Sequence, residues 1–443
     1  MLGAFVRAFR TPDLRSKIVF TLLVVAIYRI GASIPSPGVS VDHVRRCVDI
    51  ARNADSGVFT LLNLFSGGAL YQLSVFALGI LPYITASIIL QLLTVVIPRL
   101  EELKKQGQAG QAKITQYTRY LTVGLAILQS AGIIALARSG NLLPGCPKGL
   151  ELIPDTGAQP YALTIGGLIL TMTAGTALVM WLGELITDRG VGNGMSILMF
   201  SSIAARLPSE GKNILDTKGV TVFVIVLGIG VAVIGAVVFI EQAQRRIPVQ
   251  YARRIVGRRS YGDTSTYLPI KVNPAGVIPV IFATSLIYLP TILAQLGDRQ
   301  NPGPVALFIQ RYVQPPDSLV HMLLYFALVI FFTYFYTSIQ LSPTEVADNM
   351  KKRGGFVPGI RPGRPTAEYF DYVISRMLLP GSLYLGLIAI LPNLFIELAG
   401  GSQNTQNFPF GGTAVLIMVG VGLETVKQIQ SQLEQRNYEG FLR

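Results

Sequence analysis

Charge, cysteine, histidine and tryptophan are all scarce in this 443-residue chain. Charged residues make up 14% of the sequence, hydrophobic residues make up 51%, and the mean hydropathy is +0.50. Because soluble domains carry about 25% charged residues, this composition excludes an ordinary water-soluble protein. We therefore expect an all-α polytopic membrane protein.

The scarce reactive residues also exclude several kinds of chemistry. The two cysteines, Cys47 and Cys146, form no C-x-x-C pair, and the two histidines, His43 and His321, are isolated from each other. A zinc site or a nucleophilic triad needs more of these residues at closer spacing. We expect no metal, no cofactor and no catalytic residue.

Charge is also nearly absent from the interiors of the long apolar runs. Arg29, Glu184 and Glu241 lie toward the ends of such runs, where long side chains reach the membrane surface. A secondary transporter normally has charged or paired polar ligands at membrane depth, and an intramembrane enzyme has a catalytic constellation there. The sequence favours neither of these two alternatives.

Ten apolar segments are long enough, or nearly long enough, to cross a bilayer. They begin near Ile18, Val75, Leu121, Leu163, Ile197, Val220, Val277, Met322, Met377 and Thr413. The basic start of the chain leads into the first segment without an A-x-A cleavage site, so we expect an uncleaved first span. Basic residues gather on one set of alternate connections, which places both termini, including a tail at residues 429–443, in the cytoplasm. The net charge of +13 is then in part an orientation signal.

The ten spans divide into five and five at a polar connection, residues 208–219. Residues 1–207 then form an N-terminal half and residues 220–443 a C-terminal half. Two halves in series with odd numbers of spans must be inverted relative to each other, which predicts a clamshell with a central seam. The same topology places both cysteines on the outer face, where we expect separate thiols, with a disulfide as the alternative.

A stripe of isoleucines begins the second apolar segment. Ile80, Ile84 and Ile88 recur every four residues, so on a helix they share one face. The stripe either faces lipid and neighbouring helices or lines a passage that must stay shut. Residues 58–68, immediately before it, are apolar but too short to span, because a span needs about 20 residues. A short helix hinged on the paired glycines at the end of this stretch is the expected movable stopper.

Two cytoplasmic connections, residues 242–273 and 342–368, are longer and more basic than a connector needs to be. In the first, three Arg-Arg pairs alternate with apolar residues, which favours a strand or hairpin. In the second, prolines and glycines fix a stiff turn with Arg361 and Arg364 at its tip. Each loop is either an orientation signal or a docking surface for an acidic or RNA-containing partner.

Three side-chain amides lie within spans or at the start of one: Gln91, Gln129 and Asn273. Such groups normally form hydrogen bonds between membrane helices, each worth about 0.6 to 2 kcal/mol. If spans 2, 3 and 7 meet, hydrogen bonds among these residues could latch a seam between the spans, and they are weak enough to break when the seam opens sideways.

Long motifs along essentially the whole chain resemble those of bacterial SecY proteins, the channel subunits of the Sec protein-conducting translocon. They are NLFSGGAL, ALGILPYITASIILQLLTVVIP, QAGQAKITQYTRYL, WLGELITDRGVGNGMS, EQAQRRIPVQYARR, STYLPIKVNPAGVIPVIFA, GGFVPGIRPGRPTAEY and FPFGGTAVLI. The resemblance implies ten transmembrane helices in two inverted five-helix halves, forming a clamshell hinged between spans 5 and 6. It also implies an hourglass pore closed by an apolar ring and a plug.

The resemblance assigns roles to individual residues. It implies a pore ring of Ile80, Ile84, Met199, Ile281 and Ile417. It implies a plug at about residues 58–70, with Leu61, Asn63, Phe65, Ser66, Gly67 and Gly68. It implies a lateral gate between spans 2 and 3 and spans 7 and 8, with Gln91, Gln129 and Asn273 at the seam. For docking of a motor or ribosome it implies Arg245, Arg246, Arg253, Arg254, Arg258, Arg259, Arg361 and Arg364.

The resemblance also implies a function and partners. Unfolded secretory polypeptides would pass through the pore, while signal peptides and transmembrane helices would leave sideways into membrane lipids of the bacterial plasma (inner) membrane. The chain has no G-x-x-x-x-G-K-[ST] loop for ATP, so energy would come from the SecA motor, the ribosome or the membrane potential. SecE and SecG are the implied small subunits, and the basic loops would contact ribosomal RNA.

Overall fold

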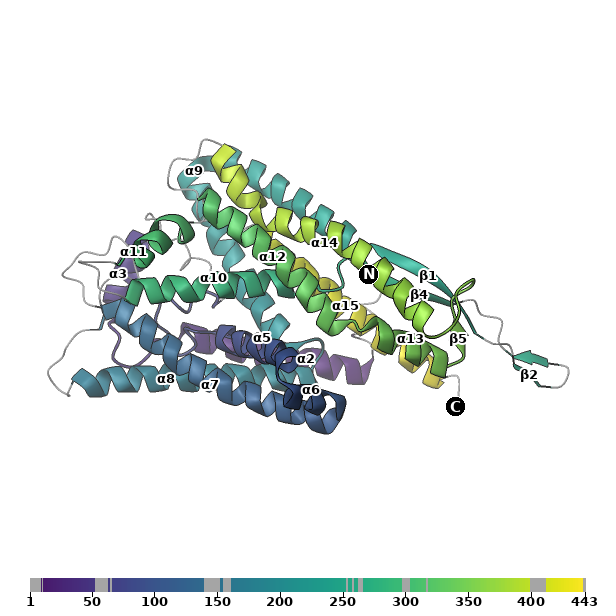
Figure 1. Ribbon diagram of the computed structural model, residues 1–443. Coiled ribbons are helices and arrows are strands. Elements are labelled where there is room, and N and C mark those ends of the chain that lie inside the picture. Colours follow the sequence, from purple (N-terminus) through teal and green to yellow (C-terminus); the bar gives the residue numbers. More distant parts are fainter. Residues whose placement is uncertain are drawn as a thin grey trace.

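Long helices run alongside one another, and a small group of strands extends from one end of them (Figure 1). The computed structural model describes residues 9, 11–51, 63, 66–138, 152–153, 161–251, 254–256, 259–261, 266–296, 303–315, 318–398 and 412–440. Strands β1, β4 and β5 lie at one end of the helices with β2 beyond them, and helices α3 and α11 lie at the other end.

The N-terminal half contributes helices α2 (Pro12–Ser33), α3 (Val41–Ala51), α5 (Leu81–Val96), α6 (Pro98–Lys105), α7 (Gln108–Arg138) and α8 (Tyr161–Arg189). Helix α9 (Gly194–Gln242) continues into the C-terminal half. The C-terminal half adds α10 (Ile278–Leu296), α11 (Pro304–Phe308), the π-helix η1 (Ile309–Val313), α12 (Leu319–Gln340), α13 (Pro343–Lys352), α14 (Arg364–Leu398) and α15 (Gly412–Gly440).

The ten predicted spans overlap these helices, with two of them on α9. In the described part, six helices are long and apolar enough to cross a membrane, or seven if the bent pair of α5 and α6 is one span. Many large apolar side chains on these helices point outward; Leu22 and Ile30 on α2, for example, are 59% and 62% exposed. Such surfaces fit a lipid environment, and the chain is a multi-pass, all-α membrane protein.

The second span begins later than its apolar run predicts. Residues 66–80 form turns, and α5 begins at Leu81 with Pro82 in its first turn. Proline fits there because the first backbone N–H groups of a helix have no partner within it. The stripe nevertheless continues through Ile80 at the N-cap, because its carbonyl accepts the N–H of Ile84 at 3.2 Å.

The connection between the two halves is mostly helical. Helix α9 begins at a polar cap, where Asn193 Oδ1 accepts the backbone N–H groups of Met195 at 3.1 Å and Ser196 at 3.5 Å. The helix runs through the predicted boundary and is interrupted at Gly219, whose φ of 81° and ψ of 171° are not helical. Glycine adopts this conformation without steric cost, so the direction of the chain changes at the last residue of the predicted connection.

The two basic connections fold into one unit. Strand β1 (Gln244–Tyr251) pairs antiparallel with β4 (Thr266–Lys271), from Gln244 opposite Lys271 to Val249 opposite Thr266. The same β1 also pairs with β5 (Gly355–Phe356), which belongs to the second connection. Strands β2 (Arg254–Val256) and β3 (Arg259–Tyr261) form a separate antiparallel pair. The predicted hairpin character of the first connection is confirmed.

An apolar cluster holds this unit on the helices. Ile247 and Val249 of β1 point inward, as the alternating pattern of the strand requires, and pack with Ala347 of α13 and Phe370 of α14. Arg245 and Arg246, at the start of β1 and before this buried pair, are both exposed.

Each half has its own apolar core, and a third cluster lies where the halves meet. The first core joins α3, residues 70–78, α7 and α8. The second joins α9, α10, α12, α14 and α15, together with Ile88 of α5. The third contains residues of α2, α8, α9, α10 and α15 and of the segment just before α5. This third cluster holds the candidate site.

Helix α3 is covalently tied on the outer side of the first core. Cys47 is fully buried and disulfide-bonded. The expectation of separate thiols is therefore wrong at this residue; Cys146, the other cysteine of the chain, lies outside the described residues.

Replacing Gly175 of α8 by alanine is expected to destabilise the protein by about 1 to 3 kcal/mol, the usual cost of overpacking. A Cβ atom at this position would overlap the carbonyl oxygen of Val75 and lie 2.9 Å from its carbonyl carbon. Both are backbone atoms, which cannot move away as the end of a flexible side chain can. Gly166→Ala in the same helix is the matched control, because a Cβ atom there meets nothing within 4 Å. Thermal unfolding of the purified variants in detergent measures the difference. Equal unfolding temperatures would contradict the close approach of α8 to residue 75.

Candidate functional site

Five apolar side chains from four places in the chain share the cluster between the halves. Ile80 and Ile84 come from the start of α5, Met199 from α9, Ile281 from α10 and Ile417 from α15. Four of them are buried, with exposures between 1% and 9%, and Ile84 packs against the cluster as a partly buried residue. The structure thus brings together the five residues of the predicted ring.

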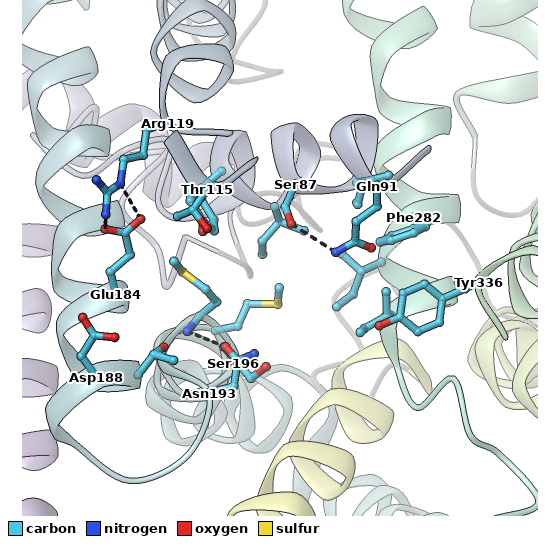
Figure 2. A pocket seen from close by; sticks show the side chains of 18 residues that line it. Ser87, Gln91, Thr115, Arg119, Glu184, Asp188, Asn193, Ser196, Phe282 and Tyr336 are labelled. Atoms are coloured by element: carbon cyan, nitrogen blue, oxygen red, sulfur yellow. Dashed lines mark hydrogen bonds and ion pairs between the residues drawn. The ribbon is translucent and has the colours of Figure 1, made fainter. Parts of the chain in front are cut away.

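A cavity of about 430 Å³ lies on one side of this ring. Ile84, Met199 and Ile281 of the ring form part of its wall. The other lining residues come from α5, from the first parts of α7, α9 and α10, and from the last parts of α8 and α12, so the cavity lies toward the predicted cytoplasmic end. Its polar lining includes Ser87, Gln91, Thr115, Arg119, Glu184, Asp188, Asn193 and Ser196 (Figure 2).

Ile88, the third member of the isoleucine stripe, does not belong to the ring cluster. It packs in the core of the C-terminal half and also lines the cavity. The stripe therefore passes from the ring at Ile80 and Ile84 to the contact between the two halves at Ile88.

An ion pair crosses the wall of the cavity from α7 to α8. Arg119 Nε donates to Glu184 Oε1 at 2.9 Å and Arg119 Nη2 donates to Glu184 Oε2 at 2.7 Å (Figure 2). This two-bond geometry fixes the orientation of both side chains. The position of Glu184 in the sequence predicts only a helix-end residue. Opposite charges on two successive spans at similar depth were the signal for this pair.

The described part of the predicted plug is a compact set of turns. Ser66 Oγ donates to the carbonyl of Asn63 at 3.1 Å and accepts the backbone N–H of Leu70 at 3.1 Å. The carbonyl of Asn63 also accepts the backbone N–H of Gly68 at 2.8 Å. Gly67 and Gly68 have φ values of 68° and 94°, a region that favours glycine. Leu61 and Phe65 lie outside the described residues, as does most of the short helix expected before the glycines, and residues 66–70 form turns at the expected hinge.

The plug segment lies on the far side of the ring from the cavity. Along α9, residues 193 to 199 line the cavity, whereas a Cβ atom on Gly67 would lie 3.3 Å from Cα of Ser202, beyond Met199. Ala69 of the same segment belongs to the ring cluster. The cavity, the ring and the plug segment therefore follow one another along α9, with the ring in the middle.

The three predicted gate amides do not bond to one another in the described part of the chain. Gln91 is exposed and its Nε2 donates to Ser87 Oγ at 3.4 Å, while Gln129 is buried in α7. Asn273 Nδ2 donates to Glu241 Oε1 at 2.7 Å and to the carbonyl of Gly276 at 3.0 Å. Helix α10 contacts both α5 and α7, and the lateral seam between these helices and its amide latch stay predictions.

The predicted docking arginines are distributed over the strand unit and the turn before α14. Arg245 and Arg246 are exposed on β1, and Arg361 and Arg364 are exposed around the turn. Thr366 Oγ1 donates to the carbonyl of Arg361 at 2.8 Å, which fixes the turn. Arg254 and Arg259 lie in β2 and β3, with side chains outside the described set, and Arg253 and Arg258 lie outside the described residues.

Comparisons with known proteins agree with this arrangement. A family model described as SecY matches residues 74–426. The chain is 60% identical to the protein translocase subunit SecY of Mycobacterium tuberculosis strain H37Rv, over 100% of both chains. It is 61% identical to the subunit of the same name from Streptomyces coelicolor, again over 100% of both.

Solved structures share the fold at low sequence identity. One described as a protein-conducting channel matches with a TM-score of 0.61 and 17% identity, covering 94% of this chain and 91% of that one. Another, from work on the SecY plug domain, matches with a TM-score of 0.60 and 18% identity over 94% and 91% of the two chains. Canine Sec61 in a ribosome-channel complex matches with a TM-score of 0.58 and 17% identity, again over 94% and 91%.

Proposed function

The chain belongs to the SecY family and forms a protein-conducting channel in a membrane, and we propose that its ring of five apolar residues seals that channel. One observation carries the proposal: side chains from both halves converge on one cluster, with a polar-lined cavity on one side and the plug segment on the other. Such an order fits a passage that narrows at the ring.

An apolar ring meets the physical demands on this passage. An unfolded polypeptide presents every kind of side chain, so fixed charges or tight hydrogen bonds at the narrowest point would hold some chains back. Apolar side chains exclude water and ions when they close on each other, and they pack around a moving chain without bonding to it. Met199 adds flexibility, because an unbranched thioether adapts its shape to its neighbours.

Sideways exit uses the seam between the halves. The contacts of α10 with α5 and α7 support a seam next to the ring, and we assign the lateral gate to these helices and α12. A signal peptide or transmembrane helix is apolar and would partition from an opened seam into lipid according to its hydrophobicity. Gln91, Gln129 and Asn273 remain our candidates for residues that tune this opening.

Transport of long soluble chains needs an outside source of energy, because the sequence has no phosphate-binding loop. The two basic connections form one unit with exposed arginines, which favours a shared docking surface for an acidic or RNA-containing partner. A Sec61 relative is described in a complex with a ribosome, and a yeast Ssh1 complex is described bound to one. We assign this surface to SecA and the ribosome, and we expect SecE and SecG as small subunits.

We place the strand unit, the cavity and both termini in the cytoplasm of a bacterium, with the chain in the plasma membrane. Leu14 near the start of α2 packs with Ile429 in the second half of α15, so these two helices meet on the side that we assign to the cytoplasm. The excess of basic residues on this side supports the orientation.

Site-specific crosslinking tests the channel directly. A photoreactive residue at Ile84 is expected to crosslink to a secretory chain stalled during transport, because the chain must pass the ring. The same residue at Phe239 is the control, since that side chain is 79% exposed on the outside of α9. Crosslinks at position 239 and none at position 84 would contradict passage through the ring and favour a different class of membrane protein.

Ile417→Asn is expected to loosen the seal, because an amide in the ring holds water in the closed gap. We expect a rise in resting ion conductance of reconstituted vesicles of roughly tenfold, the effect of about 1.4 kcal/mol on a closed-to-open equilibrium. Weak signal sequences should also be accepted more readily. Ile417→Val keeps an apolar side chain and should behave like the parent protein. An unchanged conductance in Ile417→Asn would refute the assignment of this residue to the seal.

Arg361→Glu is expected to abolish most SecA-driven translocation, because a reversed charge at the tip of the turn repels an acidic partner. Arg361→Lys keeps the charge but loses the planar fork of the guanidinium, so an intermediate rate is expected. ATP-dependent import into vesicles and binding of SecA to them are the measurements. Normal binding and import with glutamate at position 361 would remove this residue from the docking surface.

A further inference from the structure

Arg29 of α2 lies directly against the plug turn. Its Nη1 donates to the carbonyl oxygen of Gly67 at 3.4 Å. A Cβ atom built on Gly67 would overlap the same Nη1 and lie 3.3 Å from Cα of Ser202. The guanidinium therefore occupies the space that any larger residue at position 67 would fill.

The chain just after α2 holds the residues that follow the plug segment by backbone contacts. The N–H of Ser36 donates to the carbonyl of Leu73 at 3.0 Å, and the N–H of Val75 donates to the carbonyl of Ile34 at 3.0 Å. These two bonds flank a bridge between residues 35 and 74. Residues 73–75, just after the plug segment, are thus fixed to the chain that follows α2, whereas among the described residues Arg29 is the side chain of α2 that bonds to the glycine turn.

The contact of Arg29 is easily broken. Its acceptor is a neutral carbonyl at the long end of the hydrogen-bonding range, and charged acceptors bind more strongly. No carboxylate in the described part of the chain forms an ion pair with Arg29. The sequence predicts that Arg29, near the end of its span, reaches the membrane surface; its guanidinium instead contacts the plug turn, and ionisable residues in membrane spans mark functional sites.

The neighbours of the turn are rigid by comparison. Tyr28, next to Arg29, is fully buried, stacks on Phe76 with ring centroids 5.9 Å apart, and shares a hydrogen bond of 2.8 Å with Ser202. The last two turns of α2, around Tyr28, and the part of α9 around Ser202 are therefore fixed to each other. Arg29 reaches the turn from this fixed part of α2, while the turn itself has the backbone freedom of two left-handed glycines.

We propose that Arg29 is a clasp that positions the plug turn beneath the ring in the closed channel and lets go of the Gly67 carbonyl when the channel opens. The proposal rests on the function assigned above to ring and plug. In this role Arg29 is a positioning residue, and the bridge between residues 35 and 74 is the fixed end about which the freed turn moves.

Arg29→Leu tests the clasp. It removes every hydrogen-bond donor while keeping an apolar side chain within the span, and we expect the resting ion conductance of reconstituted vesicles to rise several-fold. Arg29→Lys keeps the charge and a donor and should restore most of the seal. A purely structural arginine would alter the amount of folded protein in both variants without changing the conductance per channel.

The glycines of the turn supply a second test, which holds even if Arg29→Leu fails to fold. Gly67→Ala places a methyl group where the guanidinium lies. The matched Gly68→Ala also puts alanine in the left-handed region, at a less favourable φ of 94° against 68°, but meets no atom closer than 3.5 Å. Displacement of the clasp predicts a larger leak from Gly67→Ala than from Gly68→Ala. Equal leaks, or a tight Gly67→Ala channel, would overturn the proposal.

Two further comparisons separate the clasp from the function on which it rests. If Ile417→Asn leaks and Arg29→Leu and Gly67→Ala do not, the clasp is refuted and the ring remains. If none of the three leaks, the ring and the clasp both fail. Gly67→Ala combined with Arg29→Leu should leak no more than the larger single effect, because both changes break the same contact; additive leaks would contradict the coupling.

Discussion

Apolar packing at the meeting of the two halves is the interaction on which the rest of the structure depends. The cluster draws on α2, α8 and the first arm of α9 from one half and on α10 and α15 from the other. Apolar contacts have no preferred direction, so two such surfaces can part and close again without leaving buried hydrogen-bonding groups unpaired. A channel that must open for each substrate and then seal against ions needs an interface of this kind.

The hydrogen bonds and ion pairs between helices lie mostly within each half. In the N-terminal half, Arg119 joins α7 to Glu184 of α8, and Tyr28 joins α2 to Ser202 of α9. In the C-terminal half, Asn273 joins the loop before α10 to Glu241 at the end of α9. Among the described residues, the bond from Lys104 to the carbonyl of residue 339 does cross between the halves, but it is exposed and 3.4 Å long. Each half is therefore stiffened internally, and the seam is left to apolar packing.

Local sequence patterns predicted some features well and others poorly. The ten apolar runs located the helices, because a run of about 20 apolar residues has few other stable places in a membrane protein. The alternating pattern of residues 244–251 predicted a strand, which the structure confirms. The start of α5 was misplaced, because residues 66–80 are as apolar as a helix but are held in turns by contacts with α2 and α8. The bond of Cys47 was also misjudged, because cysteine spacing does not reveal distance in space.

The sequence by itself determined that this is a multi-pass membrane protein, where its spans lie, where glycine permits a break or a turn, and, through its motifs, its family. The tertiary structure alone decided which faces meet. It placed the five ring residues in one cluster, paired Arg119 with Glu184, joined the two basic connections through β1 and β5, and set Arg29 against Gly67. The physical reason is the distance along the chain over which each interaction acts. Helix formation depends on neighbours a few residues apart. The contacts named here join segments far apart in the sequence, and the packing of the whole fold decides which of these segments meet.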